Sequence, residues 1–420
     1  MPGPVRRLAA RFALLAFGFY HVPLFLNDYP MFGGGGGETD GLSQAWGQIF
    51  GQVGLWIARH VFRLTGPMPN ALDGDNGDTS EEYARLLVGV AIAAIAAVIW
   101  TIADRRRPRA PWVERVLHLL LRYAIALGLA SYALAKIFPV QFGELDTVAL
   151  ESRVGELSPM RLMWHFMEYS RPYSMFAGIM ELSVVLLVAF RRTATLGALL
   201  CLVVMTNVAL LDICYDVPVK LFSASMAISA AVLVVYDAPR LAAAVLRRPL
   251  PPPPVETSVV RSRRWRVAGW LVKIVLIGGV LISSAVVMRS AGTNLQPPTS
   301  LPLEGMWNVT SFVQAGQELV QTAAPARWRR VVIGSWRGMI RFEDDTIASC
   351  TAQVDAAAHT LALSCSKGRT GVLSYTRDGA RLQLDGSFDH MPVIATLQRR
   401  ADSDIPLRRA KFHWMWETGG

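Results

Sequence analysis

Apolar residues in this chain collect in long uninterrupted runs, and these runs limit what it can fold into. Each run holds roughly 18–22 residues, about the length that a helix needs to cross the hydrocarbon core of a bilayer. Hydrophobic residues make up 52% of the sequence and charged residues only 18%, too apolar a balance for a soluble protein of this length. The sequence therefore predicts a polytopic α-helical membrane protein with about seven spans: Leu8–Leu26, Leu86–Ala103, Val116–Ile137, Tyr173–Phe190, Leu196–Leu211, Val219–Tyr236 and Val267–Met288.

Arginine clusters predict the orientation of these spans. With seven spans, all the clusters fall on one side, which the positive-inside rule makes cytoplasmic. No A-x-A cleavage site follows the first run, so we expect a retained helix rather than a signal peptide. We therefore expect a multi-pass protein of the bacterial cytoplasmic (inner) membrane, with a cytoplasmic N-terminus and an extracytoplasmic (periplasmic) C-terminal domain. The clusters are Arg6 and Arg7, the Asp104–Arg109 loop, Arg191 and Arg192, and the Arg240–Arg266 segment.

Changes in composition along the chain predict its domains. Residues 1–245 are expected to form one helical bundle, and residues 246–266 a proline- and arginine-rich cytoplasmic linker. The last span, residues 267–288, then connects to an outer domain at residues 301–420. Residues 43–64 have the spacing of an amphipathic helix, which lies either in the outer membrane interface or against the bundle.

After Leu301 the apolar pattern changes to a period of two, which is typical of strands. About eight short runs separated by turn residues predict an all-β domain, either an up-and-down barrel or a small sandwich. Gly305-Met-Trp307 resembles the G-x-W of the first strand in lipocalin-like barrels. Whether such a barrel is filled by side chains or holds a cavity depends on its size. The clearest runs are Gly305–Phe312, Gly338–Phe342, Thr360–Ser364, Gly371–Tyr375, Arg381–Leu384, Val393–Leu397 and Arg409–Trp416.

Charge and motifs exclude several function classes. The net charge of +10 comes from basic clusters beside the apolar runs, and no basic stripe with interleaved aromatics indicates nucleic-acid binding. No Cys/His spacing indicates a metal site. No P-loop, GxSxG, HExxH or haem motif is present, so the residues alone do not indicate a reaction.

Charged residues within or beside the spans are the candidate site. An ionisable side chain inside a membrane usually faces the bundle interior, a cavity or a partner. One interpretation is that six residues line one polar site that opens outward. The alternative is structural ion pairs, Lys136–Glu181 or Lys220–Asp216, with His165 and Glu168 solvated in an outer helix. We expect Arg122, His118 and Lys273 to reach the cytoplasmic side. The six candidates are Lys136, His165, Glu168, Glu181, Asp216 and Lys220.

Cys350 and Cys365 are the candidate disulfide. They lie in consecutive strand-like runs that a turn-prone segment, Asp355–His359, joins. Because we place this domain outside the reducing cytoplasm, we predict that the two cysteines pair. The alternative is two buried, reduced thiols on neighbouring strands.

The segment from Arg122 to Asp237 resembles the DoxX-like family of bacterial membrane proteins, which is related to the small subunit of thiosulfate:quinone oxidoreductase. A glycine followed three residues later by glutamate, as in Gly178 and Glu181, is the usual third-helix pattern of that family. The resemblance implies a four-helix core and a membrane location. The quoted stretches are Lys136–Phe142, Leu157–Trp164, Phe176–Glu181, Arg191–Gly197 and Tyr215–Lys220.

Three functions compete at this point. The resemblance implies a quinone- or thiol-linked redox membrane subunit that acts with a partner membrane or periplasmic subunit, with quinone as a possible cofactor. A second function is a carrier that binds a lipid or small molecule with the bundle and the outer β domain. The third is a non-catalytic membrane scaffold that presents the β domain to a partner. Whichever holds, the lipid bilayer is the expected surrounding of the bundle.

Overall fold

The structure divides into a helical unit and a β unit. It is a computed structural model that describes residues 4–28, 56, 59–60, 63, 78–104, 111–252, 262–295, 303–320, 324–334 and 337–409. The first unit contains residues 1–142 and 170–292, and the second contains residues 143–169 and 293–420. The expected amphipathic helix at residues 43–64 and the middle of the expected linker at residues 246–266 lie mostly outside the described residues.

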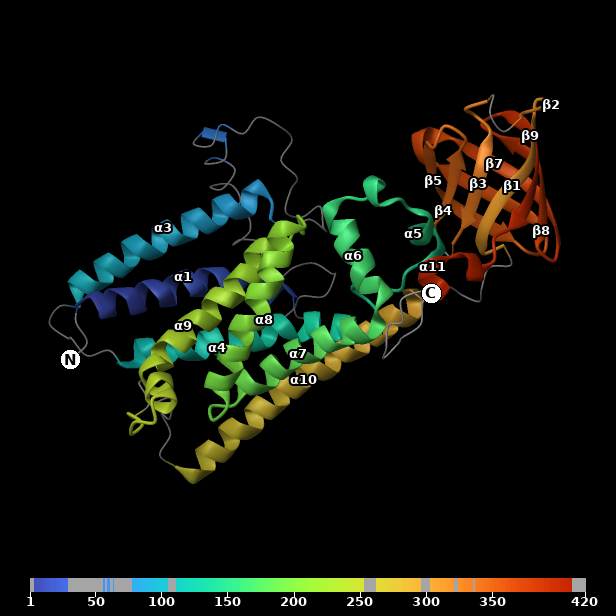
Figure 1. Cartoon of the computed structure of the whole chain (residues 1–420). Helices are drawn as coiled ribbons and strands as arrows, with labels where there is room; N and C mark the ends of the chain where they lie inside the picture. The colour runs from blue at the N-terminus through green and yellow to red at the C-terminus, as the bar shows by residue number, and fades with distance from the viewer. Residues whose placement is uncertain are drawn as a thin grey trace. The chain divides into compact units, whose positions relative to one another are not determined.

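Six helices of the first unit are long and apolar enough to cross a membrane, by length and composition. The chain is therefore a multi-pass membrane protein. Figure 1 shows these helices running from cyan α3 to yellow α10. Their bounds are α3 (Ser80–Ala103), α4 (Pro111–Ile137), α7 (Arg171–Ala189), α8 (Ala194–Cys214), α9 (Lys220–Val245) and α10 (Arg263–Leu295).

The first expected span lies within helix α1 (Pro4–Asp28), which is not among the six candidates. Figure 1 shows α1 beside α3. Arg11 of α1, only 2% exposed, donates a hydrogen bond to Asp104 at the end of α3 and lies over the Trp100 ring. The N-terminal part of α1 therefore pairs with the C-terminal end of α3, so the two helices are antiparallel. That α1 crosses the membrane stays a prediction.

Helices α4 and α7 pack closely because small residues lie between them. A Cβ atom on Gly178 of α7 would come within 2.7 Å of the Ala133 carbonyl oxygen of α4. A larger residue would push the two helices apart, as at other close helix crossings in membranes. This close contact also brings Lys136 of α4 near Glu181 of α7.

The second unit is an eight-stranded antiparallel barrel. Each strand pairs with the next along the chain, the short β2 pairs only with β1, and β1 closes the barrel by pairing with β9. This is the up-and-down alternative, because closure leaves no free sheet edge. The strands are β1 (Gly305–Gln314), β2 (Gln317–Glu318), β3 (Trp328–Ile333), β4 (Gly338–Phe342), β5 (Ile347–Asp355), β6 (Thr360–Cys365), β7 (Thr370–Asp378), β8 (Arg381–Phe388) and β9 (Met391–Arg399).

The strand expected at Arg409–Trp416 differs from what the structure shows. Residues Pro406–Arg409 form a short helix, α11, and residues 410–416 lie outside the described part of the chain. Pro406 at the first helical position lacks the N–H group that a strand would use, which favours a helical turn.

A segment between α4 and α7 belongs to the barrel unit. This segment, residues 143–169, is called the strap here; it contains α5 (Thr147–Glu151), a 3-10 turn (Val154–Glu156) and α6 (Pro159–Tyr169). The sequence placed it within the bundle domain, residues 1–245, whereas the structure groups it with the barrel. Val148 and Leu150 of the strap pack on outward residues of the barrel wall, Met339 among them. Strand β4 is consequently buried on both faces.

Candidate functional site

An ion pair buried in the bundle is the centre of the candidate site. The Lys136 ammonium, in the last turn of α4, is 3.0 Å from a Glu181 carboxylate oxygen of α7. The lysine side chain is 8% exposed and the glutamate side chain 2% exposed. Glu181 is about 15 Å from the start of α7 at the usual helical rise, well inside a span. The close α4–α7 crossing at Gly178 brings the two side chains together.

A second buried carboxylate lies in the same part of the bundle. Asp212 of α8 is 4% exposed, and among the described residues its Oδ2 atom has no hydrogen-bond partner. Asp212 lies near the Ser223 hydroxyl of α9 and within electrostatic range of Lys136. Helices α4, α7, α8 and α9 thus each contribute a polar side chain to one cluster, consisting of Lys136, Glu181, Asp212 and Ser223.

The other predicted site residues form two further pairs. Lys220 is 2.8 Å from Asp216, whose side chain is 82% exposed. His165 and Glu168 of α6 are 2.6 Å apart through the His165 Nδ1 atom, and they belong to the strap. The Glu168 side chain is only 7% exposed, so the alternative of a solvated pair is wrong for this residue. The six candidates therefore make three pairs, and a single site shared by all six stays a prediction.

Two polar residues have structural contacts that the sequence did not indicate. Asp78 accepts hydrogen bonds from the backbone N–H groups of Lys220 and Leu221, and so caps the N-terminus of α9. Arg122, expected to reach the cytoplasmic side, is instead 3% exposed and donates to the Val188 and Ala189 carbonyls at the end of α7. Both contacts are between segments distant in sequence, so no local pattern could reveal them.

The barrel interior is filled by large side chains. Trp307 of the Gly305-Met-Trp307 motif is fully buried and donates its indole N–H to the Leu303 carbonyl. Phe312 and Phe388 pack against the Trp328 ring at centroid distances of 5.1 and 5.0 Å. This packing is what a small closed barrel requires.

Cys350 and Cys365 form a disulfide in the structure. They are directly opposite each other in the β5–β6 hairpin, and both side chains belong to the barrel core. The turn between these strands, residues 356–359, lies in the segment that the sequence marked as turn-prone. Whether the disulfide forms in cells stays a prediction.

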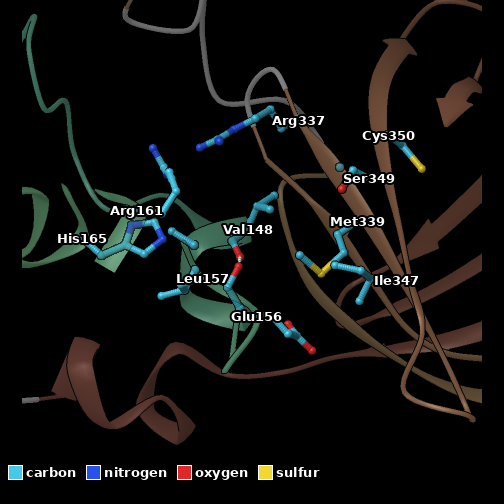
Figure 2. Close-up of a pocket in the computed structure, with 13 residues that line it drawn as sticks. Val148, Glu156, Leu157, Arg161, His165, Arg337, Met339, Ile347, Ser349 and Cys350 are labelled. Atoms are coloured by element: carbon cyan, nitrogen blue, oxygen red, sulfur yellow. Dashed lines mark hydrogen bonds between the residues drawn. The ribbon is translucent and has the colours of Figure 1, made fainter. Parts of the chain in front are cut away.

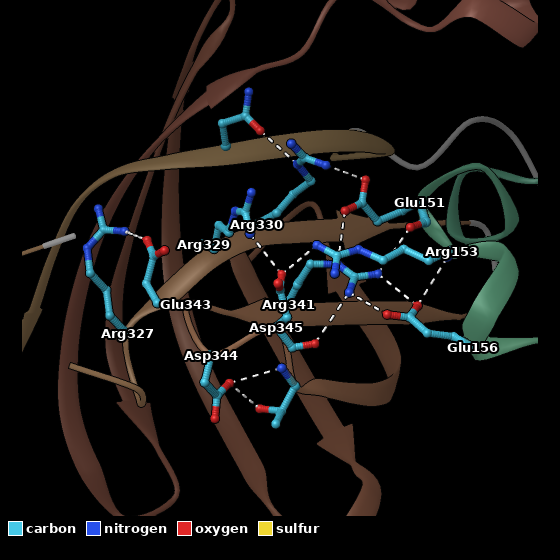
Figure 3. A network of polar contacts seen from close by, with 12 residues as sticks. Glu151, Arg153, Glu156, Arg327, Arg329, Arg330, Arg341, Glu343, Asp344 and Asp345 are labelled. Atoms are coloured by element: carbon cyan, nitrogen blue, oxygen red, sulfur yellow. Dashed lines mark hydrogen bonds and ion pairs between the residues drawn. The ribbon is translucent and has the colours of Figure 1, made fainter. Parts of the chain in front are cut away.

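A buried arginine joins the strap to the barrel wall. Arg341 of β4 is 2% exposed, and its guanidinium contacts Glu151 at 3.1 Å and Glu156 at 2.7 and 3.0 Å (Figure 3). Arg330 of β3 also bonds Glu151. The two N–H donors from Arg341 lower the pKa of the Glu156 carboxyl below its usual value. The arrangement is a bidentate, charge-assisted attachment.

A pocket lies between the strap and the outer face of β4 and β5. Figure 2 shows His165, Arg161 and Leu157 on the strap side and Met339 and Ile347 on the barrel side. The sulfur of Cys350 points away from it, toward the barrel core (Figure 2). The pocket measures about 200 Å³. Since pockets that enclose a drug-sized molecule usually measure about 300–1,000 Å³, its size does not indicate such a ligand.

Comparison with known proteins identifies a relative for part of the chain. A Bacillus subtilis (strain 168) protein, "Uncharacterized protein YwoB", is 30% identical over 125 residues, which are 30% of this chain and 79% of the relative. The chain belongs to the family of that protein. The family member is much shorter than this chain, because 125 residues are most of its length. No protein-family model and no solved structure matches the sequence.

Proposed function

We propose that this protein is a DoxX-like, quinone- or thiol-linked redox subunit of the bacterial cytoplasmic membrane. The observation that carries the proposal is the Lys136–Glu181 pair, which is buried inside two spans. A buried ion pair contributes little to stability compared with apolar residues of the same volume, so its presence favours a functional role. The resemblance to the DoxX-like family points to the same class of function.

The polar atoms of the cluster suit a quinone. A quinone accepts hydrogen bonds at its carbonyl oxygens and its reduced form donates them from hydroxyl groups. The Lys136 ammonium is a donor, and the Asp212 Oδ2 atom, which has no protein partner among the described residues, donates when it is protonated and accepts when it is ionised. When bound, a quinone would supply the electron-carrying chemistry, while these side chains bind it and hold a proton beside it.

Solvent extraction of the protein purified in mild detergent tests this function. We expect a co-purified quinone in the wild-type extract and a loss of about tenfold or more in Lys136→Met, because a charge-assisted hydrogen bond from the ammonium contributes about 1.5–3 kcal/mol. Asp216→Asn is the matched control, because the Asp216 carboxylate is exposed and pairs with Lys220 rather than with Lys136. Wild-type protein that neither retains nor binds added ubiquinone or menaquinone would refute the quinone-linked function.

We also propose that the N-terminus is cytoplasmic and that the barrel is outside. Four candidate spans, α7 to α10, lie between the strap and the barrel in the chain. An even number of crossings returns the chain to its starting side, and the strap–barrel ion pairs require both on one side. The arginine clusters then favour the outer side. A periplasm-active reporter fused after Gly420 should be active, and an active cytoplasm-dependent reporter would contradict the orientation.

A membrane scaffold is the second candidate function, and the filled barrel with its attached strap favours it. A barrel whose interior is packed with side chains presents its outer surface to a partner, and the ion pairs to the strap connect it to the chain at a second place besides α10. Such a protein would act through a partner membrane or periplasmic subunit. Native mass spectrometry separates the functions, because a scaffold would retain a protein partner and neither quinone nor lipid.

A further inference from the structure

The buried cluster of the bundle contains more negative than positive groups. Lys136 supplies one ammonium, whereas Glu181 and Asp212 supply two carboxylates, and all three residues are at most 7% exposed. Lys136 comes from α4, Glu181 from α7 and Asp212 from α8, which are three different spans. An ionised carboxylate without a cation is too costly to keep inside a membrane, so it either finds a partner or takes a proton.

The other charged groups around Asp212 have contacts of their own. Lys220 of α9 acts on Asp212 electrostatically, but its ammonium is 2.8 Å from the exposed Asp216 carboxylate. Asp78, which also acts on Asp212, is a further negative group and is bound to α9 backbone N–H groups. The buried Cys201 thiol of α8 also lies within electrostatic range of Glu181.

We propose that this cluster is a proton-binding site within the membrane, in which Asp212 carries one exchangeable proton while Lys136 and Glu181 remain a charged pair. With that proton the cluster is neutral. The Oδ2 atom of Asp212, which has no partner among the described residues, is the place for it. Any change of charge at the Lys136–Glu181 pair then changes the occupancy of Asp212, because one lysine can balance only one of the two carboxylates.

Infrared spectroscopy of the full chain in lipid nanodiscs detects this proton directly. A protonated carboxyl group has a carbonyl-stretching band that a carboxylate lacks. At neutral pH we expect such a band in the wild type and its loss in Asp212→Asn. Asp216→Asn, which removes an exposed carboxylate in the following turn, should leave the band unchanged. A band that persists in Asp212→Asn, or a wild type without the band, would overturn the proposal.

Two substitutions in the ion pair test the proposal while Asp212 itself is left intact. In Glu181→Gln the lysine loses its partner, so Asp212 should ionise and the band should disappear although Asp212 is intact. In Lys136→Met both carboxylates lack a cation and should take protons, so the band should grow about twofold. Lys136→Met leaves the cluster neutral, and we expect it to fold. An unchanged band in Lys136→Met would contradict the coupling.

The proton site and the quinone-linked function can fail separately. The site concerns only side chains of this chain, and its infrared test needs no bound quinone. A protein that shows the band but binds no quinone would refute the proposed function alone. A protein that binds quinone but shows no band would refute the proton site alone.

Discussion

The two units of this protein bury a cation in different ways. In the barrel unit, Arg341 directs its guanidinium at two carboxylates and two backbone carbonyls. In the bundle, Lys136 has one carboxylate partner at 3.0 Å and lies 5.6 Å from the Tyr132 ring centre. A planar, fully bonded guanidinium fixes one geometry, whereas an ammonium with one partner can respond to a change nearby. Arg341 therefore holds the strap in one geometry, whereas Lys136 can respond to a change of charge nearby.

The double substitution Glu181→Gln/Asp212→Asn should have the largest effect, because it leaves Lys136 buried without a carboxylate. We expect a loss of about 3–5 kcal/mol in the free energy of unfolding. Each single substitution should cost about 1–2 kcal/mol, because the remaining carboxylate balances the lysine. Chemical unfolding in detergent measures all three. Strictly additive losses would mean that the two carboxylates do not share Lys136.

Arg341→Met should have the next largest effect, because it removes the guanidinium bound to Glu156 and one of the two arginines at Glu151. We expect a loss of about 3 kcal/mol, near the lower limit for a broken buried pair since Arg330 remains. Arg329→Met is the matched control on the neighbouring strand, where an ion pair with 44% exposed side chains contributes about 0–1 kcal/mol. Limited proteolysis of the strap, together with thermal unfolding, would measure both. Equal effects would contradict a structural role specific to Arg341.

The disulfide should stabilise the barrel somewhat less. Cross-linking residues 15 apart in sequence is expected to add up to about 3 kcal/mol, less any strain. Reduction, or the Cys350→Ser/Cys365→Ser variant, should lower the unfolding temperature of the barrel and leave the bundle signal unchanged. In intact cells, alkylation without reductant should label neither residue. Labelling of both would contradict the disulfide and the outer location of the barrel.

Acidification should have the smallest effect, and it should act on the strap. The pKa of Glu156 is lowered in the folded protein by the Arg341 hydrogen bonds, so this contact stabilises fully above the ordinary carboxyl pKa of 4.5. The stabilisation is lost as pH falls through the lower, folded pKa. The unfolding temperatures of wild type and Glu156→Gln should therefore converge at acidic pH. A constant difference between them at every pH would show that Glu156 does not contribute through its charge.

Much of the fold could be predicted from local patterns. The expected span Val116–Ile137 lies within α4, and the strand expected at Gly338–Phe342 has the same bounds as β4. Strand β3 was not predicted, because Trp328–Ile333 reads as a basic pair followed by three apolar residues, without alternation. The sequence also offered Lys136 and Glu181 as an ion pair, and the structure places them 3.0 Å apart. The expected span Leu196–Leu211 ended one residue before Asp212, which lies inside α8.

By itself, the sequence determined the membrane character of the apolar runs between Leu86 and Met288, the all-β character of the C-terminal region and the adjacency of Cys350 and Cys365. Apolar runs and period-two alternation depend only on neighbours in the chain, so they remain readable without a structure. The tertiary structure alone decided that the strap belongs to the barrel, because Glu151 meets Arg341 across 190 positions. It also decided that Glu181 meets Lys136, since the close crossing of α4 and α7 at Gly178 sets their distance.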